Sequence, residues 1–279
     1  MALEFVDVLT LPGNPAKPNE DSFAHIENAA VVFDGATGLG EQLMPGESDA
    51  AWLSQFGARR LMSHIKTKRP KDAIRAAMAD AENSFMGLRK RAPVATYENP
   101  FASLMLIASN EIGIDAFWFG DCGLLVKRQT VEVIGDAFDK RAAEAARVKM
   151  LADARGLAPA AGVNRPEYLE PLRKARNRVN TETGGWLFGP DPRAADHVSH
   201  ARIETPAGTH LLLASDGFLA LATDYGCYNA DGLMDAALSK GLATLGEELR
   251  GIEETDPEGR KFARLKKSDD ATALLLKLT

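Results

Sequence analysis

The apolar residues of this chain follow two different spacings, and each spacing predicts a different element. Short segments in which apolar residues alternate or run continuously predict β-strands, because successive side chains of a strand point to opposite faces. These segments are residues 5–11, 29–33, 101–108, 112–119, 124–127, 131–134, 197–203, 209–214 and 271–278. Only three polar residues separate the segments 101–108 and 112–119, so these two are predicted to form a hairpin.

Helical spacing begins after Ser48, and either Ser48 or Asp49 is the predicted N-cap. The apolar residues that share one face of this helix are Leu53, Phe56, Leu61 and Ile65. Pro70 interrupts the pattern, and a second helix is predicted from Asp72. Further helices are predicted within residues 136–155, 166–179 and 231–254, with a short one after Asp216. Strands, two helices, strands, helices and a final strand together predict an α+β sandwich.

Four short acidic segments adjoin the apolar runs. They are Asn19-Glu20-Asp21, Phe33-Asp34-Gly35, Ser215-Asp216-Gly217 and Ser268-Asp269-Asp270. Carboxylates at strand ends can converge although they are far apart in sequence, and oxygen ligands of this kind suit Mg²⁺ or Mn²⁺. An isolated Asp-Gly pair is also typical of an ordinary turn. Its recurrence after two apolar runs favours a shared metal site.

A site built from these segments ties both ends of the chain together, so we expect one domain over residues 1–279. Its 279 residues, 45% of them hydrophobic, are enough for one large core. Residues 156–196 contain many Gly, Pro and Arg residues, and residues 136–196 together are predicted to form a helical and flap-like insertion.

The composition excludes several functional classes. A net charge of −6 argues against a nucleic-acid partner, which would need a basic surface. Cys122 and Cys227 have no spacing typical of a zinc ribbon or a disulfide framework. The sequence has neither a secretory signal pattern nor an apolar run of about 18 residues. We therefore expect a cytoplasmic protein with no membrane partner.

With Gly120-Asp121-Cys122 as a fifth segment, the order of the acidic motifs resembles the metal-dependent protein phosphatases of the 2C type, the PPM family. That family has Asn-Glu-Asp, a strand ending in Asp-Gly, a mid-chain Gly-Asp-Ser, then Ala-Ser-Asp-Gly, and a final Asp-Asn before the closing strand. The match spans residues 19–276 in the same order. The resemblance implies a bacterial-like single-domain member and an αββα sandwich, in which helix pairs flank two central antiparallel sheets.

The resemblance also implies a centre of two Mg²⁺ or Mn²⁺ ions, with a third, weaker ion as in some members. Asp34 would bridge the two ions, Asp216 would bind one of them, and Asp121 would hold the third ion together with Asp216. These three aspartates are the predicted catalytic residues. Glu20 and Asp21 would act directly or through water. The full set of implied ligands is Glu20, Asp21, Asp34, the Gly35 carbonyl, Asp121, Asp216 and Asp269.

The chain departs from the family pattern in three places. Many members have a histidine shortly after the bridging aspartate, whereas residues 35–40 here contain none. Many also have a phosphate-binding arginine before Asn-Glu-Asp, whereas the nearest cation here is Lys17, the predicted substrate-binding residue. The final pair is Asp269-Asp270 instead of Asp-Asn. Asp269 is the expected ligand by position, and Asp270 takes that role if the register shifts by one.

Two adjacent divalent ions activate water for in-line attack on phosphorus, so no nucleophilic side chain is required. The sequence therefore predicts a metal-dependent phosphatase that hydrolyses phosphoserine and phosphothreonine in a phosphorylated protein or peptide. One alternative is a phosphatase of the same fold that acts on small phosphoesters. The other is a pseudophosphatase that binds metal and serves as an interaction module.

Overall fold

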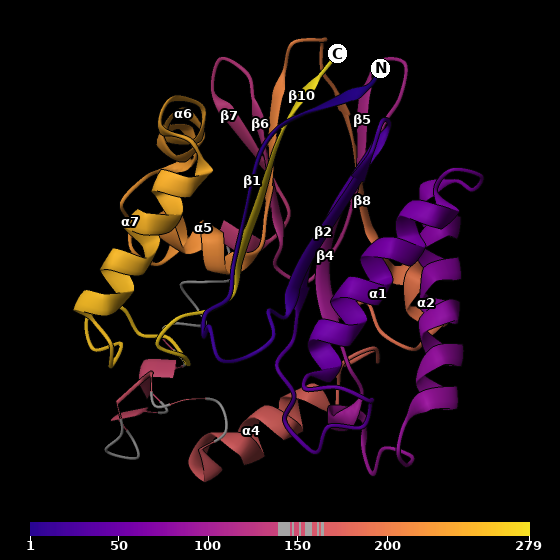
Figure 1. Ribbon diagram of the computed structural model, residues 1–279, viewed down its shortest axis with the longest axis vertical. Helices are drawn as coiled ribbons and strands as arrows, with labels where there is room; N and C mark the ends of the chain where they lie inside the picture. Colours follow the sequence, from indigo (N-terminus) through magenta and orange to yellow (C-terminus); the bar gives the residue numbers. More distant parts are fainter. Residues whose placement is uncertain (139–145, 147, 151, 154–157, 161, 163–164) are drawn as a thin grey trace.

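Two five-stranded antiparallel sheets lie face to face at the centre of the computed structural model (Figure 1). The model describes residues 1–138, 146, 148–150, 152–153, 158–160, 162 and 165–279. The first sheet has the order β1 (Leu3–Leu11), β10 (Ala271–Leu278), β9 (His210–Ala214), β6 (Gly123–Lys127), β7 (Val131–Ile134). The second has the order β2 (Asp21–Ile26), β3 (Ala29–Gly35), β4 (Ala102–Ser109), β5 (Gly113–Phe119), β8 (Ser199–Glu204).

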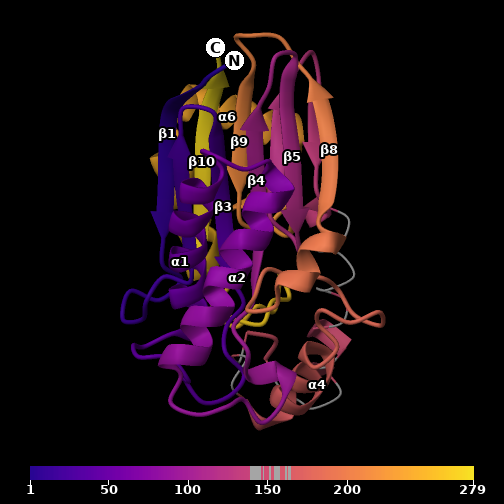
Figure 2. The same ribbon diagram turned by 90° about the vertical axis from the view of Figure 1, so that its right-hand side faces the viewer.

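Helices cover the outer face of each sheet. The helices α1 (Asp49–His64) and α2 (Pro70–Leu88) pack on the second sheet. The first sheet is covered by α5 (Asp216–Thr223), α6 (Ala230–Lys240) and α7 (Leu242–Thr255). The remaining described elements are α4 (Pro166–Arg176) and the 3₁₀ turns η1 (Thr96–Glu98) and η2 (Pro192–His197). Figure 2 shows α4 below one end of the sheets, away from both chain termini.

The core has three layers because each central strand buries both of its faces. In β10, Leu274 and Leu276 point between the two sheets, whereas Ala273 and Leu275 face the helices α5 to α7. This two-sided burial explains why β10 is an almost continuous apolar run instead of an alternating one. The same applies to β4, whose first six residues are all buried.

The structure confirms the predicted αββα sandwich of two antiparallel sheets, including the hairpin of β4 and β5. Ser48 is the N-cap of α1, where its hydroxyl accepts a hydrogen bond from the Ala51 N–H at 3.1 Å. The second helix begins at Pro70, two residues before the predicted start, because a proline in the first turn lacks only an N–H that has no helical partner.

One strand, β2, was not predicted. It is a short edge strand with several polar residues. Its pairing with β3 stabilises an extended conformation that its own sequence does not indicate. Much of the helix predicted within residues 136–155 lies outside the described residues. The helical and flap-like insertion over residues 136–196 stays a prediction. Among the described helices, none combines the length and the apolar composition needed to cross a lipid bilayer.

We expect Leu274→Ala to lower the free energy of unfolding by about 2–5 kcal/mol, because it leaves a cavity between the sheets. Leu274 is fully buried there. The matched control is Leu238→Ala in α6, where the leucine is 38% exposed and the loss should stay below about 1 kcal/mol. Urea unfolding of the metal-free protein measures both. Equal losses in the two variants would contradict the packing described here.

Candidate active site

The registers of the two sheets bring the acidic segments to one end of the sandwich. Asp21 at the start of β2 is paired with Asp34 near the end of β3, and Asp34 is in turn paired with Ser103 of β4. In the other sheet, the last residue of β9, Ala214, is paired with Ala273 of β10 and with Gly123 of β6. Figure 1 shows this end of the sheets directed towards α4.

Three aspartates converge at this end. Asp34, Asp121 and Asp216 each present a carboxylate oxygen, and these oxygens lie within 4.8 Å of one another. Ser103 donates a hydrogen bond to Asp121 Oδ1 at 2.6 Å. The preceding Gly120 has a φ of +74°, and a Cβ there would lie 2.0 Å from Ser103 Oγ. The turn after β5 therefore needs a glycine in order to aim Asp121 at the other two carboxylates.

The same region contains two aspartates whose negative charge is unfavourable. Burial, followed by the charges of Asp216, Asp21 and Asp121, raises the pKa of Asp34 well above its ordinary value. Burial also raises the pKa of Asp21, against the hydrogen bond from Ser215 and with the charges of neighbouring aspartates. Ser215 Oγ donates to Asp21 Oδ2 at 2.7 Å. Asp21 Oδ1 is buried and has no hydrogen-bond partner among the described residues.

Glu20 lies beside this cluster and is oriented by two hydroxyl groups. Thr37 Oγ1 donates to Glu20 Oε2 at 2.5 Å, and the helix cap Ser48 donates to Glu20 Oε1 at 2.7 Å. The Gly35 N–H donates to the Glu20 carbonyl at 3.0 Å. A Cβ on Gly35 would lie 2.5 Å from that carbonyl oxygen and 2.9 Å from the carbonyl oxygen of Ala50. The Asp-Gly pair is therefore required by a close backbone approach.

The final acidic pair divides into two different environments. Both carboxylate oxygens of Asp270 accept backbone N–H groups at 2.6 Å, one from Gly13 and the other from Glu20. Asp269 Oδ1 instead accepts hydrogen bonds from the ammonium of Lys266 at 2.7 Å and from the backbone N–H of Asp270 at 3.0 Å. Asp270 thus fastens the segment that carries Glu20, whereas Asp269 faces a cation.

Arg250 of α7 holds the backbone of the segment that carries Asp269 and Asp270. Its guanidinium donates to the Asp269 carbonyl at 2.9 Å and to the carbonyls of Leu11 and Pro12 at 3.2 Å. Glu253, which is almost fully buried, pairs with Arg250 at 2.7 Å. Helix α7 therefore fixes the backbone at Asp269 relative to the end of β1.

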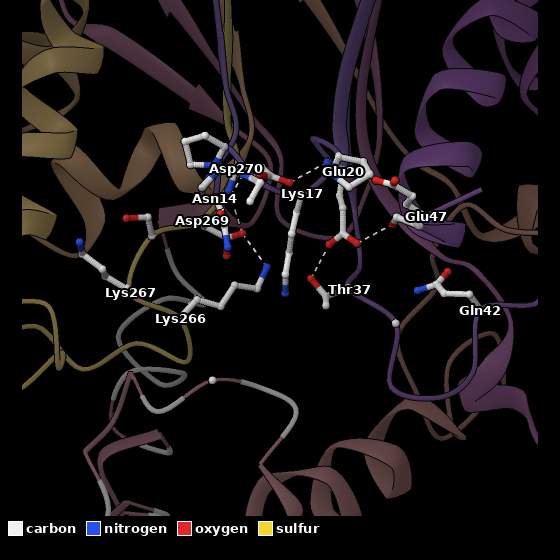
Figure 3. Close-up of a pocket in the computed structure, with 18 of the residues that line it drawn as sticks. Asn14, Lys17, Glu20, Thr37, Gln42, Glu47, Lys266, Lys267, Asp269 and Asp270 are labelled. Carbon is white, nitrogen blue, oxygen red and sulfur yellow. Dashed lines mark hydrogen bonds and ion pairs between the residues drawn. The ribbon is translucent and has the colours of Figure 1, made fainter.

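A cavity of about 910 Å³ opens beside these carboxylates. Residues that line it include Lys17, Glu20, Thr37, Lys266, Asp269 and Asp270. Figure 3 shows the side chains of Lys17 and Lys266 pointing into this cavity, Lys266 from the side that carries Asp269 and Lys17 from between Asp270 and Glu20. Lys17, the predicted substrate-binding residue, is exposed and makes no side-chain hydrogen bond or ion pair with the described residues.

A further cation lies close to Glu20. Arg176 is the last residue of α4; burial lowers its pKa to about 10, and the negative charge of Glu20 opposes that shift. Its guanidinium therefore remains charged at neutral pH. Cations thus approach Glu20 both from α4 and from the loop before β10, where the charge of Glu20 also acts on Lys266.

The structure brings together most of the predicted site residues. Asp34, Asp121 and Asp216 form the cluster, Asp21 and Glu20 lie next to it on β2 and the preceding loop, and Asp269 and Asp270 line the cavity. Their roles as metal ligands stay a prediction. Sequence reasoning missed the residues that orient the carboxylates, which are Ser48, Thr37, Ser103, Ser215 and Arg250. It also missed Lys266, whose only local signal is its position three residues before Asp269.

Comparison with known proteins identifies solved structures of similar fold. No protein-family model matches the chain, and no curated protein does. The serine/threonine phosphatase PstP/Ppp of Mycobacterium tuberculosis superposes with a TM-score of 0.58 and 15% identity over 100% of this chain and 99% of that one. The PPM Ser-Thr phosphatase MsPP of Mycobacterium smegmatis, solved with cacodylate, gives 0.56 and 16% over 98% and 97%.

The chain has the PPM phosphatase fold. A third structure, the catalytic domain of PstP in complex with two manganese ions, covers 100% of this chain and 99% of its own, with a TM-score of 0.56 at 15% identity. The matches extend over both sheets and the helices on either side of them. At this level of identity they establish the fold that the acidic motifs predict.

The residues of this PPM fold suit a hard divalent cation. Three convergent carboxylates, a buried Asp21 oxygen without a partner and the raised pKa of Asp34 are all features that a nearby cation would relieve. The donor set consists of oxygen atoms and matches Mg²⁺ or Mn²⁺ better than zinc or copper.

Replacing Asp34 by asparagine is expected to stabilise the metal-free protein at neutral pH. The pKa of Asp34 is raised in the folded state, so the folded protein retains this proton at pH values where the unfolded chain has lost it. The contribution of Asp34 to stability is therefore largest at acid pH and falls as the pH rises above the ordinary value of 3.8. We expect Asp34→Asn to raise the free energy of unfolding near pH 7.5 and to have much less effect near pH 4.

The matched control is Asp80→Asn. Burial raises the pKa of Asp80, but the hydrogen bonds from His64 and Arg60 outweigh burial and lower it. Asp80→Asn should therefore destabilise the protein at neutral pH, the opposite sign. Urea unfolding in the presence of a chelator at both pH values measures the two variants. An Asp34→Asn protein that is less stable than the wild type near pH 7.5 would show that Asp34 is not an unfavourable buried charge.

Proposed function

We propose that this chain is a metal-dependent phosphoprotein phosphatase that hydrolyses phosphoserine and phosphothreonine. The observation that carries the proposal is the convergence of Asp34, Asp121 and Asp216 within a PPM fold, beside the unpartnered oxygen of Asp21. Two Mg²⁺ or Mn²⁺ ions would supply an activated water and would neutralise the phosphate oxygens. PstP, which has the same fold, was solved with two manganese ions.

The proposed ligand roles follow the family resemblance, and the convergence of the carboxylates supports them. Asp34, near the end of β3, would be a ligand of both ions, and the Gly35 carbonyl would bind one of them. Asp216 and Asp269 would bind the other ion, and Asp121 with Asp216 would hold the third. Glu20 and Asp21 would contribute directly or through water. Asp269 is preferred to Asp270 as the ligand, because both oxygens of Asp270 already accept backbone N–H groups.

The residues around the cluster determine how a substrate enters. The cavity beside Glu20 and Asp269 is wide enough for a phosphorylated side chain, and Lys17 at its mouth is placed to attract the phosphate charge. Residues 35–40 contain no histidine, so the proton for the leaving alkoxide would have to come from water or from another residue. A general acid contributes about 10²–10⁴ in rate, so we expect faster turnover of aryl phosphates than of alkyl phosphates.

A second candidate is a pseudophosphatase that binds a partner without chemistry. The Lys266 ammonium lies 2.7 Å from Asp269, where a metal ligand is proposed, and this ion pair favours that candidate. Four carboxylates arranged for cations, namely Asp21, Asp34, Asp121 and Asp216, favour the enzyme.

We expect Asp34→Asn and Asp216→Asn each to lower Mn²⁺-dependent hydrolysis of p-nitrophenyl phosphate by at least about 100-fold, because ligand loss exceeds the 10–100-fold effect of residues that only support ligands. Both proteins should still unfold cooperatively. Asp235→Asn is the control, because Asp235 is exposed and forms an ion pair with Lys127, and neither residue belongs to the proposed site. Retained hydrolysis in either active-site variant would show that the ligands are misassigned. A wild-type protein that binds Mn²⁺ without hydrolysing the ester would favour the metal-binding pseudophosphatase, and one that binds no Mn²⁺ would contradict the enzyme.

The substrate class is tested by comparing wild-type kcat/KM for a phosphothreonine peptide with that for small sugar and nucleoside monophosphates under the same Mn²⁺ concentration. We expect the peptide to be the better substrate, because the cavity is open and lined by residues from several loops. A higher kcat/KM for a small metabolite would replace the protein substrate with a small phosphoester.

A further inference from the structure

The cavity contains a cation that the motif pattern does not predict. Among its described lining residues, the cations are Lys17, Arg165, Lys266 and Lys267. Lys17 is exposed, whereas the side chain of Lys266 is 29% exposed and lies against Asp269. Lys266 is therefore the lysine that combines contact with the carboxylates and access to the cavity (Figure 3).

The loop that carries Lys266 is built to hold it there. Asp256, at the end of α7, accepts the backbone N–H groups of Arg260 at 2.9 Å and Phe262 at 3.0 Å. It also pairs with Arg264 at 2.9 Å, and both of these side chains are only 10% exposed. Because Arg264 is two residues before Lys266, this buried pair fixes the direction from which Lys266 enters the cavity.

The Lys266 ammonium lies beside the carboxylates as a hydrogen-bond donor. Its Nζ donates to Asp269 Oδ1 at 2.7 Å. An ammonium has three donors and no acceptor, and its bond to Asp269 uses one of the three.

We propose that the Lys266 ammonium binds the phosphate oxygens of the substrate by hydrogen bonds, and that Asp269 holds this ammonium until the phosphate replaces it. Lys266 and a divalent cation compete for Asp269 Oδ1. When a metal ion binds Asp269 Oδ1, the Lys266 ammonium loses its ion pair. The dianionic phosphate monoester in the adjoining cavity then becomes the anion that the ammonium binds. Lys266 thus replaces the phosphate-binding arginine that many PPM members have before Asn-Glu-Asp. Lys17, which is more exposed, is a second cation for the phosphate. The metal-coupled part of this inference rests on the proposed function.

The exchange can be tested without metal or turnover, with inorganic phosphate as the probe. In chelator-treated protein, Asp269→Asn removes the carboxylate that holds Lys266. We expect this variant to bind phosphate about 10-fold more tightly than the wild type, as measured by isothermal titration calorimetry. The double variant Asp269→Asn with Lys266→Gln should lose this gain entirely. Asp269→Asn with Lys261→Gln is the matched control and should keep it, because Lys261 is exposed, carries the same charge and does not line the cavity.

With Mn²⁺ present, Lys266→Gln in the otherwise wild-type chain should raise KM for a phosphothreonine peptide about 10-fold while Mn²⁺ binds at least as tightly as before. Lys266→Arg, which keeps the charge, should recover most of the KM and guards against a folding defect in the glutamine variant. Equal phosphate affinity in the Asp269→Asn protein with and without Lys266→Gln would overturn the proposal. That result leaves the phosphatase function standing. Absent Mn²⁺ binding by the wild type instead overturns the function and the metal-coupled part of the inference, but leaves the binding of phosphate by Lys266.

Discussion

The whole arrangement depends on the mutual repulsion of carboxylates held at one end of a β-sandwich. Asp34, Asp121 and Asp216 are within 4.8 Å of one another, and Asp21 is buried beside them. Burial raises the pKa of Asp34, and the charges of the neighbouring aspartates raise it further, because carboxylates this close cannot all remain ionised without compensation. The fold withstands this repulsion because the aspartates sit at the ends of strands that are fixed by two large buried interfaces. The clustered negative charges are unfavourable without a counterion, so a bound cation would stabilise this part of the structure.

Several residues outside the acidic cluster connect the helices and loops to the carboxylates and fix their positions. Ser48 caps α1 and also orients Glu20, so one hydroxyl joins the helix to the site. Arg250 joins α7 to the backbone of Asp269, and Asp270 joins the final loop to the segment before β2. The two sheets therefore meet at the site through hydrogen bonds as well as through packing. Positioning of this kind is what a metal-dependent reaction requires from its protein.

The sequence predicted the fold well wherever burial controls the pattern. The run 271–278 corresponds to β10, and Ser48 is the N-cap, since both depend on local physical rules. The edge strand β2 was missed because the partner strand β3, not its own composition, determines its conformation. The site was predictable where the acidic residues follow apolar runs, as at Asp34 and Asp216. Lys266 and Arg250 were not, because no short motif marks them and they reach the site only through tertiary contacts.

The most direct test of the metal centre is a crystal structure grown in excess Mn²⁺, with anomalous diffraction recorded at the manganese edge. We expect two anomalous peaks about 3.5–4 Å apart, bridged by Asp34, with Asp216 and Asp269 on the second ion and Lys266 displaced from Asp269. The absence of an anomalous peak between Asp34 and Asp216, with the ion pair of Lys266 and Asp269 intact, would contradict a metal centre at this position.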